Sequence, residues 1–396
     1  NFGFGYFNEL AENEQISFQF DFDDHDDYEI SEYEDVINNT DDKGSNRIFM
    51  LDYNRPIQNS YNSEDSRIEA GIKINSNNDR KNQNYNDNPF NYNYDQDRLS
   101  AYVNASYYFT ESFGIQGGLR FEKSTTNSFL NPGDIDLDNP ENVFEWTLSE
   151  LGDDLDYEYN YDRVYPSLYF LYNMKEKGDL KFEFGRRINR PSEWNTNPFP
   201  DISDGSLIHQ GNPYLKPEDI YKCEFSYSNR LPIGYLSAEI YFSRTTNLID
   251  RHKFNKTYND DIYQILTWVN KGKSEDSGFE IMFMTRPLPM WSLMISGNFW
   301  YNNTIEAEDE NMLGVESGFW GYTRSTFKLK DDQEIQLSGH FSTKMKLTTG
   351  EISPMKMMDF AYKKEIDDRF NITLKVKDIF NSRGFHIITD QDIDYD

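Results

Sequence analysis

The stretch RRINRPSEWNTNPFPDISDGSLIHQGNPYLKPE, Arg186 to Glu218, separates two segments in which apolar and polar residues alternate. It contains five prolines, and each proline removes a backbone donor and fixes φ. Neither a helix nor a central strand can therefore run through it. We predict a long loop that connects two β-strands.

Alternating segments recur on both sides of this loop. Residues 180–184 place Leu, Phe and Phe on one face and Lys and Glu on the other, and residues 16–22, 68–74, 236–243 and 370–377 follow the same rule. Successive side chains of a strand point to opposite faces, so each segment has one apolar and one polar face. The pattern predicts an all-β chain.

The connections between these segments alternate between short and long. We predict short turns at 110–112, 175–178, 231–233, 287–290, 330–333 and 366–369, and long loops at 78–96, 127–161, 189–216, 248–260 and 305–316. Short turns at one end and long loops at the other are typical of a transmembrane antiparallel up-and-down β-barrel. A soluble β-sandwich would seldom keep all its long loops at one end, and we find no 40 to 50 residue repeat of the kind that a β-propeller shows.

Composition agrees with a barrel and excludes other classes. Aromatic residues make up 16% of the 396 residues, and the mean hydropathy of -0.83 excludes a bundle of membrane helices. Aromatic clusters such as 107–109 and 299–301 predict a girdle at the membrane interface. The net charge of -30 argues against nucleic acid as a partner, and much of it lies at 23–42, 87–97, 134–162 and 306–316, which we predict to be loops. The single Cys223 cannot form an internal disulfide.

Four motifs resemble one protein family. Residues 165–199, YPSLYFLYNMKEKGDLKFEFGRRINRPSEWNTNPF, followed by GNPYLKPE at 211–218, are similar to the barrels of TonB-dependent receptors common in Bacteroidetes. NKGKSEDSGFEIMFMTRPLPMWSLMISG at 270–297, ITLKVKDIFNSRGF at 372–385 and GIQGGLRFE at 114–122 extend the resemblance. The family-like part covers residues 97–385.

The resemblance also implies segments that this sequence does not contain. Family members hold a plug domain inside the barrel and close it with a last strand, and nothing in the sequence resembles either. We count about sixteen strands where the family barrel has about twenty-two. We therefore interpret residues 1–396 as one outer-membrane β-barrel domain that is incomplete at both ends.

The residues do not form a recognisable catalytic constellation. The five histidines, His25, His209, His252, His340 and His386, are scattered over different segments, four of them in predicted loops, and none pairs with a Ser or Cys nucleophile. His340 alternates with Phe341 and is expected to face the lumen. We predict that the protein is not an enzyme.

We expect no cofactor, and the sequence offers one candidate metal site, a calcium loop. Asp134, Asp136, Asp138 and Glu145 match ligand positions of a twelve-residue calcium loop. No helices flank the loop, Pro140 interrupts it, and a loop this acidic matches by chance. A solvated acidic loop is the alternative.

Two sets of residues are candidates for function. Residues expected to organise the long loop are Arg187, Arg190, Pro191, Asn197, Pro198, Phe199, Gly211, Asn212, Pro213, Lys216, Pro217 and Glu218. Residues expected to face the lumen are Arg120, Glu122, Glu183, Glu224, Glu239 and Lys375. Lumen-facing charges contact a plug or a passing solute in a receptor, and in any wide barrel they also hydrate the wall.

The resemblance implies an outer-membrane receptor in a Gram-negative bacterium. Its extracellular loops would bind a solute or polypeptide, which would pass through a plugged lumen when a TonB-type energy-coupling protein acts on the plug. Partners would be outer-membrane lipid, the coupling protein and a surface lipoprotein or other subunits of an outer-membrane complex. The alternatives are a structural barrel in a secretion or surface-lipoprotein assembly and a soluble extracellular binding module.

Overall fold

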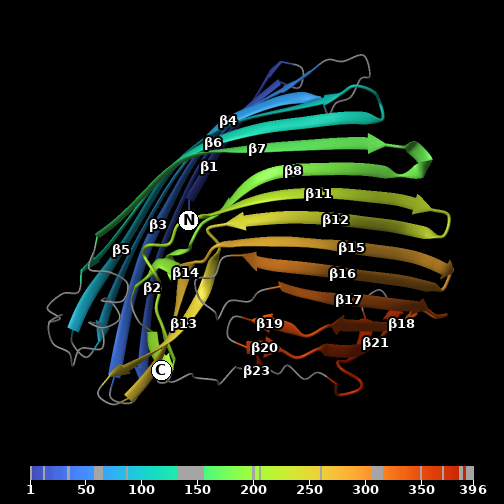
Figure 1. The fold of residues 1–396 in the computed structure, drawn as a ribbon. Coiled ribbons are helices and arrows are strands. Elements are labelled where there is room, and N and C mark those ends of the chain that lie inside the picture. The colour runs from blue at the N-terminus through green and yellow to red at the C-terminus, as the bar shows by residue number, and fades with distance from the viewer. Residues whose placement is uncertain are drawn as a thin grey trace.

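The computed structural model describes residues 2–11, 14–33, 36–57, 66–85, 88–131, 156–198, 201–204, 207–258, 261–305, 315–347, 350–367, 370–382 and 387–388. Sixteen antiparallel strands form one sheet in chain order, and the sheet curls around a hollow (Figure 1). This arrangement confirms the predicted all-β architecture. The strands are β1 (Phe2–Ala11), β2 (Glu14–Tyr33), β3 (Val36–Pro56), β4 (Arg67–Tyr85), β5 (Asn88–Tyr108), β6 (Phe113–Asn131), β7 (Asp156–Asn173), β8 (Asp179–Asn189), β11 (Glu218–Leu231), β12 (Gly234–Thr246), β15 (Lys273–Leu288), β16 (Trp291–Ile305), β17 (Val315–Lys328), β18 (Gln333–Ser342), β21 (Met355–Asp367) and β22 (Phe370–Val376).

The outer face of this sheet exposes apolar side chains in a continuous band. On β12, Ile240 is 59% and Phe242 is 47% exposed, and the band runs from Phe4 on β1 to Leu374 on β22. Polar side chains such as Glu239 alternate with them and line the inner face. An apolar outer face around a polar interior fits a sheet that is surrounded by hydrocarbon.

Aromatic rings gather at the end of the sheet where short turns join the strands. Tyr107 and Phe109 lie with ring centroids 5.0 Å apart, and Phe109 stacks on Phe113 at 5.8 Å. Farther along the sheet, Trp291 stacks on Phe327 at 5.7 Å with an interplanar angle of 7°. Their position supports the girdle predicted from the sequence.

The short turns lie where the sequence predicts them, and one depends on a glycine. The 3-10 turn η1 (Lys175–Lys177) between β7 and β8 ends at Gly178, which has φ +94°. A Cβ at this position would lie 2.3 Å from the Ser228 carbonyl oxygen. Only glycine fits both constraints.

We expect Gly178→Ala to destabilise the barrel by about 1–3 kcal/mol, because alanine is strained at positive φ and collides with a neighbouring strand. Urea titration of the protein refolded in lipid vesicles measures the change. Gly117→Ala is the matched control, since a Cβ there meets nothing within 4 Å. Equal midpoints for the two variants would contradict the expectation.

Two predicted loop regions are strands instead. The apolar face of β5 ends near Leu99, but the strand continues to Asn88 and pairs with β4 as far as Tyr85. Residues 78–96 are thus mostly strand rather than loop, and the acidic stretch 23–42 forms the outer halves of β2 and β3. These extensions are polar on both faces, so backbone pairing forms them without the apolar alternation on which the prediction relied.

Strands β7 and β8 separate from each other at one proline, on its long-loop side. β7 and β8 pair only from Ser167 and Gly185 toward the short-turn end, whereas β7 continues to Asp156 alongside β6. Pro166 has no N–H to donate, and the ladder between β7 and β8 stops beside it. The wall is consequently tall from β2 to β7 and lower from β8 onward.

A smaller sheet lies in the hollow of the large one (Figure 1). It contains β13 (Ile249–Tyr258), β14 (Asp261–Asn270), β10 (Leu207–His209) and β9 (Asp201–Asp204), in that order. Together with the helical turn α2 (Glu193–Thr196), we call it the loop unit. It corrects two predicted loops: 248–260 contains β13, which pairs with β14, and 189–216 contributes β9 and β10, because β10 pairs with the other edge of β14. Ile208, Leu215, Ile265 and Leu266 form its buried core.

Three short strands form a third sheet, β19 (Met345–Leu347), β20 (Gly350–Ile352) and β23 (Ile387–Ile388). Within the described residues, no helix is long and apolar enough to cross a membrane.

Candidate functional site

The loop between β8 and β11 folds back on itself through its Asn-Pro and Gly-Asn motifs. The Gly211 amide donates to the Asn197 carbonyl at 2.8 Å, and the Asn212 amide donates to the Asn195 carbonyl at 2.7 Å. A Cβ at Gly211 would lie 2.3 Å from the Asn197 oxygen, so the close approach requires glycine. The Gln210 side chain, which is 1% exposed, donates to the Pro198 carbonyl at 2.8 Å.

Side-chain amides attach this loop to the β13–β14 hairpin. Asn270 donates to the Lys216 carbonyl at 2.8 Å and accepts from the Lys216 amide at 2.7 Å. The side-chain amide of Asn212 donates to the Trp268 carbonyl at 2.9 Å. These bonds replace the ladder that irregular backbone cannot make, and they join two loops into one folded unit.

Glu218 holds the loop unit to the start of the barrel strands. Its carboxylate accepts from the Asn189 side chain at 2.7 Å and from the Ile249 amide at 2.6 Å, and the residue is 6% exposed. One carboxylate therefore joins β8, β11 and β13.

We expect Glu218→Ala to loosen the β13–β14 hairpin, since each bond to a carboxylate contributes about 1.5–3 kcal/mol. Amide hydrogen exchange in the peptide 249–258 should speed up by about tenfold or more. Glu275→Ala, which removes a partly exposed carboxylate 3.9 Å from Arg244, should leave this exchange unchanged. Unchanged protection in Glu218→Ala would show that the carboxylate does not hold the hairpin.

The inner faces of β5, β6 and β7 form a charged grid beneath the loop unit. Cross-strand register places nine lumen-facing residues in three rows: Arg98, Ser124 and Tyr161; Ser100, Glu122 and Arg163; Tyr102, Arg120 and Tyr165. The outer faces of the same strands carry Leu99, Phe121 and Val164, which are 42–46% exposed. The grid thus lies at the same height as the edge of the apolar band that is nearer the long loops.

Glu122 is the centre of this grid. Its carboxylate accepts from the Tyr161 hydroxyl at 2.7 Å, from Ser100 at 3.3 Å and from the Arg190 guanidinium. The side chain of Glu122 is 2% exposed. Arg190 also donates to the Tyr161 oxygen at 2.8 Å. An arginine of the long loop is therefore paired with a carboxylate of the barrel wall.

Asp219 fills the division between β7 and β8. It pairs with Arg163 at 2.6 Å and with Arg186 at 2.9 Å. Arg186 also donates to the Val164 carbonyl at 3.1 Å, which supplies a partner to β7 where β8 has separated from it. Side chains thus close the wall where the backbone ladder does not.

A tyrosine above the grid contacts the loop unit directly. Burial raises the pKa of Tyr157, at the loop end of β7, to about 12. Its hydroxyl is therefore neutral at physiological pH and donates to the Tyr214 carbonyl at 3.4 Å. The rings of Tyr157 and Tyr214 meet edge to face at 5.1 Å.

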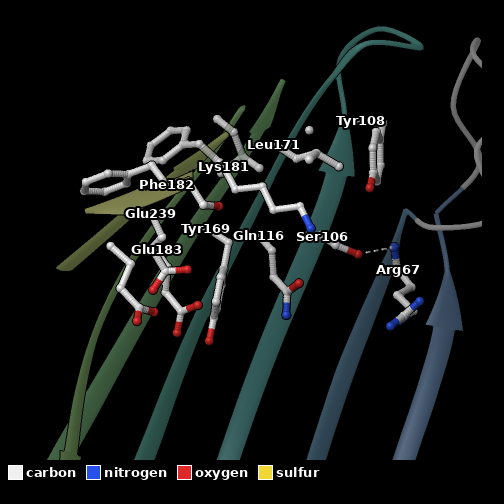
Figure 2. Close-up of a pocket in the computed structure, with 15 residues that line it drawn as sticks. Arg67, Ser106, Tyr108, Gln116, Tyr169, Leu171, Lys181, Phe182, Glu183 and Glu239 are labelled. Atoms are coloured by element: carbon white, nitrogen blue, oxygen red, sulfur yellow. Dashed lines mark hydrogen bonds between the residues drawn. The ribbon is translucent and has the colours of Figure 1, made fainter. Parts of the chain in front are cut away.

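A second polar site lies in the short-turn half of the lumen. A cavity of about 370 Å³ is lined by Lys181, Tyr169 and the carboxylates of Glu183, Glu224 and Glu239. Figure 2 shows Lys181 extending toward Ser106, while Glu183 and Glu239 point along the wall with Tyr169 and Gln116. This wall can bind and orient polar or cationic groups.

A third group of polar residues lies on β17 to β22. Lys375 and His340 line a cavity of about 610 Å³, and the His340 ring lies 4.7 Å from that of Tyr322. His340 thus lies on the inner face. His25, His209 and His252 lie in β2, β10 and β13 rather than in loops, because those strands are the polar elements that the alternation did not predict. His386 lies outside the described residues.

The structure assigns different places to the remaining candidates. Pro191, Pro213 and Pro217 line a closed cavity of about 20 Å³ under the loop unit. Arg187 bonds Glu183 at 2.8 Å on the wall, and its side chain is 59% exposed. Phe199 and the calcium candidates Asp134, Asp136, Asp138 and Glu145 lie outside the described residues. Elsewhere, no group of three or more His, Cys, Asp or Glu side chains is placed to hold a metal within the described part of the chain.

Sequence reasoning missed the contribution of the β13–β14 hairpin. Asn270 and Trp268 bond the long loop across more than fifty residues, and Tyr161 and Asp219 complete the charged contacts. The buried residues of β14, Ile265 to Trp268, are consecutive rather than alternating, so this hairpin shows no two-residue period in the sequence. The GNP motif at 211–213, Lys216 and Glu218 are the parts of this contact that the sequence indicated.

These features define a transmembrane β-barrel with a polar lumen and a folded unit within it. Residues 1–396 match the model of the outer membrane protein beta-barrel family, and the chain belongs to that family. It is accordingly an outer-membrane protein, with its short turns at the periplasmic end and its long loops outside the cell.

Solved structures share this fold at low sequence identity. The ferric yersiniabactin uptake receptor FyuA from Yersinia pestis has a TM-score of 0.67 at 14% identity, over 94% of this chain and 54% of that one. The copper transporter OprC has a TM-score of 0.66 at 9% identity, over 98% and 62%. The ferric citrate transporter FecA has a TM-score of 0.63 at 13% identity, over 96% and 56%. The chain thus spans a little over half of these proteins. No curated protein matches it in sequence.

Proposed function

We propose that this chain is the barrel of an energised uptake receptor, which binds a solute or polypeptide at its extracellular mouth and passes it through the lumen. The observation that carries the proposal is the loop unit, seated in the hollow of a barrel whose inner wall is polar and charged. A passive pore needs an open channel, whereas an uptake receptor needs a mouth that binds before it opens.

The fold likeness to an uptake receptor and two transporters supports this function. Coupling to a TonB-type protein and movement of a plug rest on the family resemblance of the sequence motifs. A surface lipoprotein is a further partner under this proposal. The role is transport rather than catalysis, in keeping with the uptake receptor and the transporters that share this fold.

Depletion of the growth medium tests the proposal without a known substrate. Cells with and without the full-length gene are grown in a complex medium, with and without a protonophore, and the solutes and peptides left in the medium are measured. We expect at least one compound to disappear only when the protein is present and the membrane is energised. Identical profiles would contradict uptake, and a subunit of a secretion assembly would instead change the proteins found outside the cell.

A further inference from the structure

The charged grid and three residues beside it, Arg186, Arg190 and Asp219, together hold more arginines than carboxylates. Arg98, Arg120, Arg163, Arg186 and Arg190 approach two carboxylates, those of Glu122 and Asp219. Lys73 and Asp52 face the lumen at the margin of this group and offset each other. The buried carboxylate of Glu218, next to Asp219, is a third negative group, so in a chain of net charge -30 this mouth region carries a local surplus of two positive charges.

Four of the five arginines share the carboxylates of Asp219 and Glu122. Asp219 is shared by Arg163 and Arg186, and Glu122 is shared by Arg190 and Arg120, which is 3.6 Å away. Arg98 is not recorded in an ion pair or a hydrogen bond with any described residue, although it lies directly across from Ser124 and near Glu122 and Arg190. The surplus guanidinium charges repel one another unless an anion joins them.

Two buried hydroxyls of the grid, in its first and third rows, also lack hydrogen-bond partners. The Tyr165 hydroxyl and the Ser124 hydroxyl are buried without a hydrogen bond in the described structure, and the two residues are 5% and 1% exposed. The guanidinium carbons of Arg120 and Arg186 lie 4.8 and 5.6 Å from the centre of the Tyr165 ring. Buried polar groups in proteins are nearly always bonded, so these hydroxyls indicate a missing acceptor.

We propose that the arginine cluster of Arg98, Arg120, Arg163, Arg186 and Arg190 is an oxyanion-binding site for the solute that the receptor takes up. The planar guanidinium binds carboxylate or phosphate oxygens in pairs, and the Ser124 hydroxyl across from Arg98 and the Tyr165 hydroxyl beside Arg120 are further donors for such groups. Arg190 belongs to the long loop, so an anion that competes with Glu122 for it also acts on the loop unit. The proposal rests on the uptake function and assigns its substrate class: a soluble solute that carries carboxylate or phosphate groups.

Titration calorimetry of the full-length protein in detergent tests the site, with pyrophosphate and citrate as separate probes at low ionic strength. We expect at least one probe to bind, and Arg98→Gln to weaken it by about tenfold or more, since Arg98 is an arginine without a recorded partner. Arg80→Gln, which removes an arginine bonded to Asp95 on the outer wall at 2.7 Å, should change the affinity by less than about twofold. Absence of binding at millimolar probe, or equal losses in the two variants, would overturn the proposal.

A second variant separates binding from folding. Tyr165→Phe removes an unpartnered hydroxyl, so it should leave the barrel at least as stable in urea while it weakens the probe. Unchanged affinity in Tyr165→Phe would remove the hydroxyl from the site. Competition by anionic lipid added to the micelles would assign the oxyanion to the membrane rather than to a soluble solute, which would contradict the proposed substrate class.

The two proposals fail separately. If the protein depletes only neutral or cationic compounds from the medium, uptake stands and the oxyanion site falls. If the probes bind but nothing is depleted, the site stands and the uptake function falls.

Discussion

Glu122→Ala should destabilise the barrel by about 3–5 kcal/mol, because it removes one partner of a buried ion pair and leaves Arg190 without its carboxylate. The same change removes the acceptor of the Tyr161 hydroxyl, which bonds Glu122 at 2.7 Å. Urea titration of the protein refolded in lipid vesicles, read by mobility on gels, measures the loss.

Two further variants identify the cause. The double variant Glu122→Ala, Arg190→Ala should recover part of the stability, since no unpaired charge remains. Glu183→Ala removes a carboxylate from the same inner face, but its partner Arg187 is 59% exposed, and we expect a loss below about 1 kcal/mol. A loss of similar size for Glu122→Ala and Glu183→Ala would show that burial of the pair does not matter.

Val103→Arg should destabilise the barrel by about 2–4 kcal/mol, because Val103 lies on the outer face of β5 halfway between Leu99 and Tyr107, in the middle of the apolar band. Asn93→Arg is the matched control on the same strand and the same face, beyond the band, where we expect about 0–1 kcal/mol. Refolding yield and urea midpoint in vesicles measure both variants. An arginine tolerated equally at the two positions would mean that this face does not meet hydrocarbon.

The barrel itself could be predicted from the sequence because its outer face is apolar. Apolar and polar residues alternate in segments such as 180–184 and 236–243, because one face of each strand meets lipid. The short turns can then be placed between these segments. The extensions of β2 to β5 could not be predicted in this way. At Asn75 to Asn93 both faces are polar, and only pairing with the neighbouring strand makes the backbone extended.

The candidate residues were predictable one at a time but not as contacts. Alternation places Glu122 on the inner face, and the prolines place Arg190 at the start of a loop. Their ion pair joins residues 68 positions apart and depends on how β6 and the loop unit sit in three dimensions. The separation of β7 from β8 at Pro166, which gives Asp219 and Arg186 their place, depends equally on the register of the whole sheet.

The orientation of the barrel is the claim on which the mouth, the grid and the receptor function all depend, and cysteine labelling tests it most directly. With Cys223 replaced by serine, Tyr28→Cys on the tall wall and Asp331→Cys in the turn between β17 and β18 are exposed to a membrane-impermeant maleimide. In intact cells we expect Tyr28→Cys to react and Asp331→Cys to react only after the outer membrane is opened. Labelling of Asp331→Cys but not of Tyr28→Cys in intact cells would contradict the account.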